Sequence, residues 1–203
     1  MKIFITGTDT NVGKTLISSW LALHTGFSYF KPIQTGLKEG SDSSEVQRLA
    51  NAKIYPESYA YNAPLSPHLA AKIEAEKIDL EKIILPQENN LIIEGAGGVL
   101  VPINDQYLMI DLIKKLGAPV IVVARTSLGT INHTLLSLEA LKSRNIPIVG
   151  VIMNGEQNSQ NSNAIEFYGQ TSILTQFPKL EAVNKDTLQN VALTDKLKQS
   201  LEA

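Results

Sequence analysis

The chain has 203 residues, of which 43% are apolar, and its 18 basic and 20 acidic residues leave a formal net charge of −2. This balance argues against a nucleic-acid partner and against binding to an anionic membrane surface. The sequence has no cysteine, which excludes disulfides, thiolate nucleophiles and cysteine-based metal sites, and we expect a cytoplasmic protein because we find neither a signal peptide nor an apolar run of membrane-spanning length.

In the first half of the chain, short β-prone runs alternate with helical stretches. The expected elements are a strand over residues 3–6, a helix over 14–24, a strand over 27–31, a helix capped by Ser41 or Asp42 that ends near Ala50, a loop over 55–67 and a short helix over 69–75. The loop is expected because it contains three prolines.

The alternation continues in the second half. The expected elements are a strand over 91–94, a helix over 109–116, a strand over 119–124, a helix over 131–143, a strand over 147–153, a flexible polar loop over 154–163, a strand over 172–175 and a terminal helix over 187–201 with Leu188, Val191, Leu197 and Leu201 inward. This order predicts one α/β domain over residues 1–203, with a mostly parallel sheet flanked by helices on both faces. Ligands of such folds bind at the carboxyl ends of the strands.

The strongest motif, GTDTNVGKT, begins at Gly7 and lies between the first expected strand and helix. This context is typical of a P-loop, whose backbone N–H groups hold the phosphates of a nucleoside triphosphate. Gly13 permits an unusual backbone conformation, Lys14 supplies positive charge to the phosphates, and the Thr15 hydroxyl can bind Mg²⁺. Thr8 stands at the position of the usual first glycine. The motif predicts a P-loop NTPase-type fold.

Three charged residues are candidates for the chemistry beside this loop. Glu94 ends a strand and precedes a glycine-rich turn, so it is a candidate Mg²⁺ ligand, although a plain strand-to-turn junction would look the same. Asp42 is a second candidate ligand or simply a helix cap. Lys31 ends the second strand, where a cation can stabilise charge during phosphoryl transfer, whereas a lone lysine is ordinarily solvated.

A further candidate site is the start of the helix that follows Gly129. The sequence GTINH opens this helix, and its free N–H groups can hold a carboxylate. An ordinary helix cap is the alternative, and the residues alone leave both possibilities open.

Taken together, these strings resemble the dethiobiotin synthetase family. The matching strings are TGTDT at residues 6–10, VGKT at 12–15, YFKPIQTG at 29–36, SD at 41–42, PLSPH at 64–68, EGAGG at 94–98, LGTINH at 128–133 and GVIMN at 150–154. They follow the family's order and cover residues 2–155, whereas the last fifty residues match only weakly.

The resemblance implies an ATP- and Mg²⁺-dependent cyclo-ligase. Such enzymes join CO₂ to 7,8-diaminopelargonic acid and close the ring of dethiobiotin, releasing ADP and phosphate. One amine and CO₂ form a carbamate, which attacks the γ-phosphate to give a carbamic–phosphoric anhydride, and the other amine then expels phosphate. Members of the family are homodimers, in which the helix start at residues 129–132 of one subunit holds the substrate carboxylate in the other.

The resemblance also implies roles for individual residues. Lys14 and Lys31 would be catalytic, and Thr15, Asp42 and Glu94 would hold Mg²⁺. The nucleotide site would comprise Thr10, Asn11, Val12, Gly13, Lys14, Thr15, Asp42, Glu94, Gly95, Ala96, Gly97, Asn154, Gly155, Pro178, Lys179 and Leu180. The diamine site would comprise Thr35, Gly98, Gly129, Thr130, Ile131 and Asn132.

Some features depart from the family, and two other functions compete with this one. Asn11 stands where relatives often carry glutamate, and the base-binding segments match weakly, which leaves base selectivity open.

A P-loop ATPase switch of the partitioning type shares the expected fold, but usually has a lysine where this chain has Asp9. An amidoligase of cobalamin synthesis normally needs a glutaminase cysteine, which this chain lacks.

Overall fold

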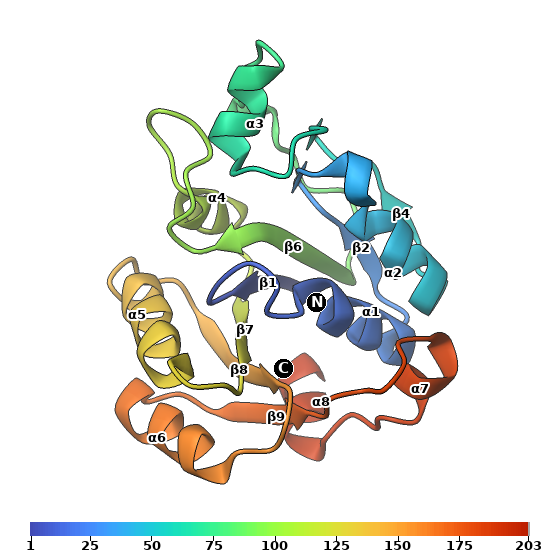
Figure 1. Cartoon of the computed structure of the whole chain (residues 1–203), viewed down its shortest axis with the longest axis vertical. Helices are drawn as coiled ribbons and strands as arrows, with labels where there is room; N and C mark the ends of the chain where they lie inside the picture. The colour runs from blue at the N-terminus through green and yellow to red at the C-terminus, as the bar shows by residue number, and fades with distance from the viewer. Residues whose placement is uncertain (203) are drawn as a thin grey trace.

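A seven-stranded sheet forms the centre of the computed structural model, which describes residues 1–202 (Figure 1). The strand order is β4-β2-β6-β1-β7-β8-β9, and the neighbouring strands pair in parallel. The strands are β1 Lys2–Gly7, β2 Ser28–Phe30, β4 Ile54–Tyr55, β6 Leu91–Gly98, β7 Val120–Arg125, β8 Ile148–Asn154 and β9 Ile173–Phe177. The predicted parallel sheet is confirmed.

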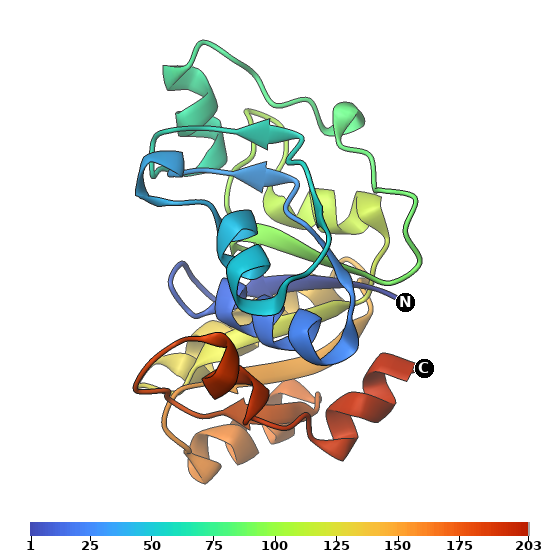
Figure 2. The same ribbon diagram turned by 90° about the vertical axis from the view of Figure 1, so that its right-hand side faces the viewer.

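Helices cover both faces of the sheet, as predicted. They are α1 Lys14–Thr25, α2 Asp42–Ala50, α3 Pro67–Ile73, α4 Met109–Leu116, α5 Thr130–Lys142, α6 Ser159–Gly169, α7 Lys185–Gln189 and α8 Asp195–Glu202. Side chains alternate along each strand, so Ile3 and Ile5 face α1, whereas Phe4 faces α4. Figure 2 views the molecule from the side of α1, α2 and α7. None of the helices within residues 1–202 is long and apolar enough to cross a membrane.

The polar segment 154–163 is only partly the loop that its composition predicts, because α6 begins at Ser159. The side chain of Asn158 accepts a hydrogen bond of 2.9 Å from the backbone N–H of Asn161 and so caps the helix. Ser162 and Ile165 then face the core. The prediction was wrong here because the residues that favour loops also make good helix caps.

Two further segments are more ordered than the sequence indicates. Within the expected loop 55–67, β5 (Tyr59–Ala60) pairs with β3 (Ile33–Gln34) in a small second sheet. The strand β6 does not stop at its first glycine but continues to Gly98, which lies opposite Gly7 of β1. Short 3₁₀ helices, Leu37–Glu39 and Leu80–Lys82, complete the elements of this half.

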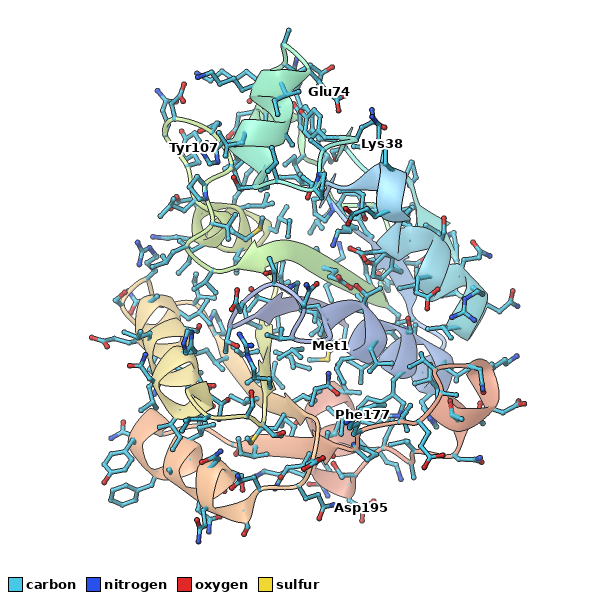
Figure 3. The ribbon with its side chains drawn as sticks, in the orientation of Figure 1. Met1, Lys38, Glu74, Tyr107, Phe177 and Asp195 are labelled. Carbon is cyan, nitrogen blue, oxygen red and sulfur yellow. The ribbon has the colours of Figure 1, made fainter. Side chains whose placement is uncertain are left out.

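The expected terminal helix is broken into α7 and α8. The indole N–H of Trp20 donates to the carbonyl of Val191 at 2.7 Å, and the Thr194 hydroxyl donates to the carbonyl of Leu174 at 2.7 Å. These tertiary contacts hold the intervening segment against α1 and β9. Phe177, labelled in Figure 3, ends β9 and packs edge-on against Trp20 at 5.0 Å between ring centroids. The predicted inward residues are nevertheless correct, with Leu188, Leu197 and Leu201 buried and Val191 half-buried.

The carboxylate of Glu88 links several residues at the edge of the sheet, and its protonation is expected to make the stability of the fold depend on pH. Glu88 accepts hydrogen bonds from the hydroxyl of Tyr55 at 3.1 Å, Lys53 at 3.3 Å, the backbone N–H of Asn89 at 3.0 Å and the hydroxyl of Ser28 at 3.2 Å. The bonds from Tyr55, Lys53 and Asn89 hold the pKa of Glu88 below its ordinary value of 4.5. A carboxyl group whose pKa is lower in the folded than in the unfolded protein stabilises the fold at pH values above its unfolded-state pKa. This stabilisation is lost as the pH falls through the folded-state pKa.

We therefore expect Glu88→Gln to lower the free energy of unfolding at pH 7. The difference between the variant and the wild type should shrink as the pH falls below the ordinary value of 4.5. Urea denaturation of both proteins across this pH range measures the difference. A difference that grows towards acidic pH would contradict the assignment.

Candidate active site

The carboxyl ends of six neighbouring strands, β2-β6-β1-β7-β8-β9, bring the sequence-predicted segments to one edge of the sheet. The loop after β1 becomes the P-loop, and β6 ends beside it through the pairing of Gly7 with Gly98. On the other side, Arg125 pairs with Asn154, and Asn154 pairs with Phe177. Residues 155 and 178–180 therefore follow their strands at the same edge as the P-loop.

The P-loop is closed by a contact from β8. The side-chain amide of Asn154 donates to the carbonyl of Val12 at 2.9 Å. Asn11 has φ 56° and Gly13 has φ 97°, so two left-handed residues turn the loop into α1. A Cβ atom at Gly13 would lie only 2.1 Å from the amide nitrogen of Asn154. Glycine is therefore required at this position by conformation and by space.

We expect Gly13→Ala to weaken nucleotide binding by about tenfold or more, because the left-handed conformation and the displaced Asn154 both deform the loop. Equilibrium titration with a fluorescent ATP analogue measures this. Gly117→Ala is the matched control, since Gly117 also has positive φ, of +66°, but has nothing within 4 Å of the added atom. The control should lose some stability and keep its nucleotide affinity, whereas an equal loss of affinity in both variants would contradict the explanation.

Lys14 is buried at the start of α1. Its ammonium group donates to the carbonyl of Asp9 at 3.1 Å, which holds the side chain back along the loop. Burial lowers the pKa of Lys14, although Glu94 nearby partly opposes this effect. The carboxylate of Asp9 pairs with Arg125 at 2.7 Å and so ties the loop to the end of β7.

Glu94 is the centre of a buried charge cluster and is 0% exposed. Its Oε1 atom accepts from the Thr15 hydroxyl at 2.9 Å and from the Lys31 ammonium at 3.2 Å. Lys31 also pairs with Oδ2 of Asp42 at 2.5 Å. Strand register explains the arrangement, because Phe30 lies opposite Ile93 and the next pair is therefore Lys31 and Glu94. The structure thus joins residues from the P-loop, β2, α2 and β6.

The contact between Lys31 and Asp42 favours the charged forms of both. Burial alone would lower the pKa of Lys31, but the carboxylates of Glu94 and Asp42 outweigh it and raise the pKa above the ordinary value of 10.5. Burial opposes ionisation of Asp42 as well, but the adjacent Lys31 lowers the pKa of Asp42 below its ordinary value of 3.8. Lys31 therefore carries a proton and a positive charge at neutral pH.

The same cluster has the donor chemistry that Mg²⁺ prefers. Two carboxylates and a hydroxyl, from Glu94, Asp42 and Thr15, meet beside the P-loop. Mg²⁺ bound with a nucleotide uses one or two carboxylates together with phosphate oxygens and waters. Within residues 1–202, no group of three or more His, Cys, Asp or Glu side chains could hold a metal alone. The residues present therefore fit a metal that arrives with a triphosphate.

The side chain of Gln34 holds its neighbour Thr35 beside this cluster. The Gln34 side chain donates to the carbonyl of Thr35 at 2.7 Å and accepts from the backbone N–H of Asp42 at 3.2 Å. One buried side chain thus sets the spacing between the Thr35 loop and α2. On the opposite side, a Cβ atom at Gly98 would contact the carbonyls of Gly7 and Thr8 at 3.4 and 3.5 Å. The 95–98 segment therefore lies directly against the P-loop.

The helix start after Gly129 is a separate feature of the same edge. Gly129 and Asn132 are exposed and Ile131 is half-buried, whereas Thr130 is buried and its hydroxyl donates to the carbonyl of Arg125 at 2.5 Å. The backbone N–H of Thr130 donates to the carbonyl of Ser127 at 3.1 Å, so this group already has a partner. Only part of the predicted set can therefore present donors to a ligand.

The predicted base-binding segments lie beyond Asn154. Gly155 has φ 135° and its N–H donates to the carbonyl of Phe177 at 3.0 Å, while an added Cβ would meet the Thr126 hydroxyl at 2.5 Å. Pro178 and Leu180 are half-buried and Lys179 is exposed. Gly155 follows Asn154, which contacts the P-loop, and residues 178–180 follow the next strand. Their role in base recognition stays a prediction.

Four residues with contacts at this edge were missed from the sequence. They are Ser18 and Tyr29, whose hydroxyls donate to Glu94 at 2.7 and 3.0 Å, together with Gln34 and with Arg125, the partner of Asp9. Ser18 could have been found, since it lies one helical turn after Lys14 and Thr15 and therefore on their face. Tyr29 precedes Lys31 by two residues and shares its side of the strand. The Asp9–Arg125 pair carries no comparable sequence signal.

Comparisons with known proteins agree with this geometry. The profile of a family described as AAA domain matches residues 1–187. The ATP-dependent dethiobiotin synthetase BioD of Lawsonia intracellularis is 58% identical over 199 residues, covering 98% of each chain. The protein of the same name from Paramagnetospirillum magneticum is 50% identical over 188 residues, covering 92% of each chain.

Among solved structures, a ParA family ATPase from Chlorobium tepidum TLS is similar with a TM-score of 0.58 at 16% identity, covering 98% of this chain and 95% of that one. The cell division ATPase MinD of Pyrococcus furiosus gives a TM-score of 0.57 at 13% identity, covering 99% and 95%. At such identities the likeness shows the P-loop NTPase fold alone.

Proposed function

This chain belongs to the dethiobiotin synthetase family, and from that membership we propose that it joins CO₂ to 7,8-diaminopelargonic acid and closes the ureido ring of dethiobiotin. It is an ATP-dependent ligase of biotin biosynthesis. The observation that carries the proposal is the Lys31 ammonium, held between Glu94 at 3.2 Å and Asp42 at 2.5 Å beside the P-loop. A fixed positive charge next to a triphosphate cradle suits the transfer of a phosphoryl group to an anionic acceptor.

The proposed chemistry needs no nucleophile from the protein. One substrate amine adds to CO₂ and loses a proton, which gives a carbamate. A carbamate oxygen attacks the γ-phosphorus, and the bond from that phosphorus to ADP breaks. The second amine then attacks the carbonyl carbon of the mixed anhydride and loses a proton, and the C–O bond to phosphate breaks as the ring closes. Positioning and electrostatic stabilisation supply the rate enhancement.

Each residue of the cluster has a proposed task. The N–H groups of the P-loop and the Lys14 ammonium bind the phosphates, and Lys31 orients the carbamate and balances the charge on the γ-phosphate. Thr15, Asp42 and Glu94 would hold Mg²⁺, which would neutralise phosphate charge when bound. Thr35 and Gly98 would contact the diamine. Asn154 and residues 155 and 178–180 would contact the base.

We also propose a homodimer in which the helix start of one subunit binds the substrate carboxylate of the other. The exposed Gly129 and Asn132 support this. Asn132→Ala is then expected to raise the KM for the diamine by about tenfold, the scale of a lost hydrogen bond to a charged group, with kcat little changed. Steady-state kinetics measure this, and Asn163→Ala, at an exposed asparagine of α6, is the control. An unchanged KM would remove the helix start from the site.

The rival function, a partitioning-type ATPase switch, shares only the fold. Phosphate release with and without diaminopelargonate and bicarbonate separates the two, because a ligase consumes ATP only when both acceptors are present. Release that depends on both, with dethiobiotin formed in equal amount, supports the ligase. Release that is independent of the diamine would reject it. That residues 1–203 act as a single domain is part of the proposal. The cytoplasmic location stays a prediction from the sequence.

A further inference from the structure

The two carboxylate oxygens of Glu94 have different surroundings. Oε1 accepts from Thr15 and Lys31, both of which belong to the proposed active site. Oε2 accepts from the Ser18 hydroxyl at 2.7 Å and the Tyr29 hydroxyl at 3.0 Å. A carboxylate oxygen has about two lone-pair directions, so two donors saturate Oε2.

Secondary structure fixes both of the donors to Oε2. Ser18 lies one turn into α1, on the helix face that carries Lys14 and Thr15. Tyr29 lies on β2 opposite Ile92 of β6, so its ring runs along the same side of the sheet as Glu94. Both side chains are 0% exposed and are packed between the sheet and α1. They can neither rotate into solvent nor be replaced by bulk water.

The two donors to Oε1 differ from Ser18 and Tyr29, because each can form another interaction if it leaves Glu94. Lys31 keeps its pair with Asp42 at 2.5 Å, and the Thr15 hydroxyl can itself bind a metal. Only Oε1 can therefore be released to a cation.

We propose that Ser18 and Tyr29 are positioning residues that hold Oε2 of Glu94, so that the carboxylate offers a single oxygen to the metal and thereby favours Mg²⁺ over Ca²⁺. The inference rests on the proposed function in that the metal enters with the nucleotide. Mg²⁺ requires a compact octahedral set, whereas Ca²⁺ accepts larger sets and two-oxygen binding by one carboxylate. Freeing Oε2 would permit the two-oxygen arrangement.

Metal binding to the protein with a non-hydrolysable ATP analogue tests this without turnover. Mn²⁺ serves as the spectroscopic probe for Mg²⁺, read by electron paramagnetic resonance, and Ca²⁺ is titrated as its competitor. The variants are Ser18→Ala, Tyr29→Phe and the double variant. The analogue contributes equally in every case, so a change in the ratio of the Ca²⁺ Kd to the Mn²⁺ Kd reports on Glu94.

We expect this ratio to fall by about tenfold or more in the double variant, the scale of losing the hydrogen bonds that orient a metal ligand. A ratio equal to that of the wild type would overturn the inference. If the double variant does not fold, as judged by thermal unfolding, the single variants carry the test.

Two controls remove a matched hydroxyl elsewhere. Tyr55→Phe deletes a tyrosine donor to Glu88, and Ser137→Ala deletes a buried hydroxyl of α5 that bonds the backbone carbonyl of His133. Both should keep the wild-type ratio. Because no diamine is present, the measurement is independent of the proposed reaction: a fall in the ratio supports the positioning role even if phosphate release fails to depend on the diamine.

Discussion

Lys31→Ala is expected to lower kcat by about 100- to 1000-fold, the scale observed when a preorganised charge donor is removed from an active site. In the folded protein Lys31 is 3% exposed and its ammonium contacts both Glu94 and Asp42, so alanine removes a fixed positive charge from the centre of the cluster. The equilibrium affinity for the ATP analogue should change much less than kcat, because Lys14 and the loop amides still bind the phosphates. Rapid-quench measurement of ADP formation gives the rate.

The loss of Lys31 also leaves two carboxylates without their cation, which is expected to cost stability. Thermal unfolding with and without nucleotide and Mg²⁺ separates this effect from catalysis. Lys53→Ala is the control, since it removes a surface lysine that pairs with Glu88 at 3.3 Å. Turnover of Lys31→Ala at the wild-type rate would remove Lys31 from the chemistry.

Lys14→Ala is expected to abolish turnover nearly completely, with a loss of at least about 100-fold in kcat and a raised Kd for ATP. Its ammonium is the buried cation of the P-loop and donates to the carbonyl of Asp9 at 3.1 Å, a neutral partner that it can exchange for phosphate oxygens. Alanine preserves the start of α1, because it has the highest helix propensity. Calorimetric titration with the ATP analogue measures the change in Kd.

The two lysine variants are informative as a pair. Lys14→Ala should lose both affinity and rate, whereas Lys31→Ala should lose mainly rate. Lys114→Ala, at an exposed lysine of α4, is the helix control and should match the wild type. Equal losses of nucleotide affinity in the Lys14 and Lys31 variants would contradict the division of roles.

The strands and most helices could be predicted because local pattern and tertiary burial agree. The Val/Ile run of β7 is buried on both faces, and the P-loop motif stands where a strand meets a helix. The prediction failed where a distant contact decides the structure. The break between α7 and α8 depends on Trp20 and its bond to the carbonyl of Val191, 171 residues away. The small β3–β5 sheet likewise joins two-residue strands that carry almost no pattern.

For the site, the sequence identifies the edge but not the contacts within it. Lys31 and Glu94 are found because the sequence places each at the expected end of a strand, and Asp42 is found because it stands at an expected helix start. Their mutual distances depend on the register of β2 against β6, which no local pattern encodes. The asymmetry between the two oxygens of Glu94 depends on side-chain rotamers as well. A sequence lists the ligands of such a cluster, and only the packed structure shows which oxygen each donor reaches.

The most direct measurement of the central claim follows an oxygen atom from CO₂ into phosphate. Freshly dissolved ¹⁸O-labelled CO₂ is mixed with excess enzyme, ATP, Mg²⁺ and the diamine in unlabelled water, and the phosphate from a single turnover is analysed by mass spectrometry. If a carbamate oxygen attacks the terminal phosphorus beside Lys31, each phosphate carries one labelled oxygen. Phosphate that instead takes its new oxygen from water would show simple ATP hydrolysis and contradict the account.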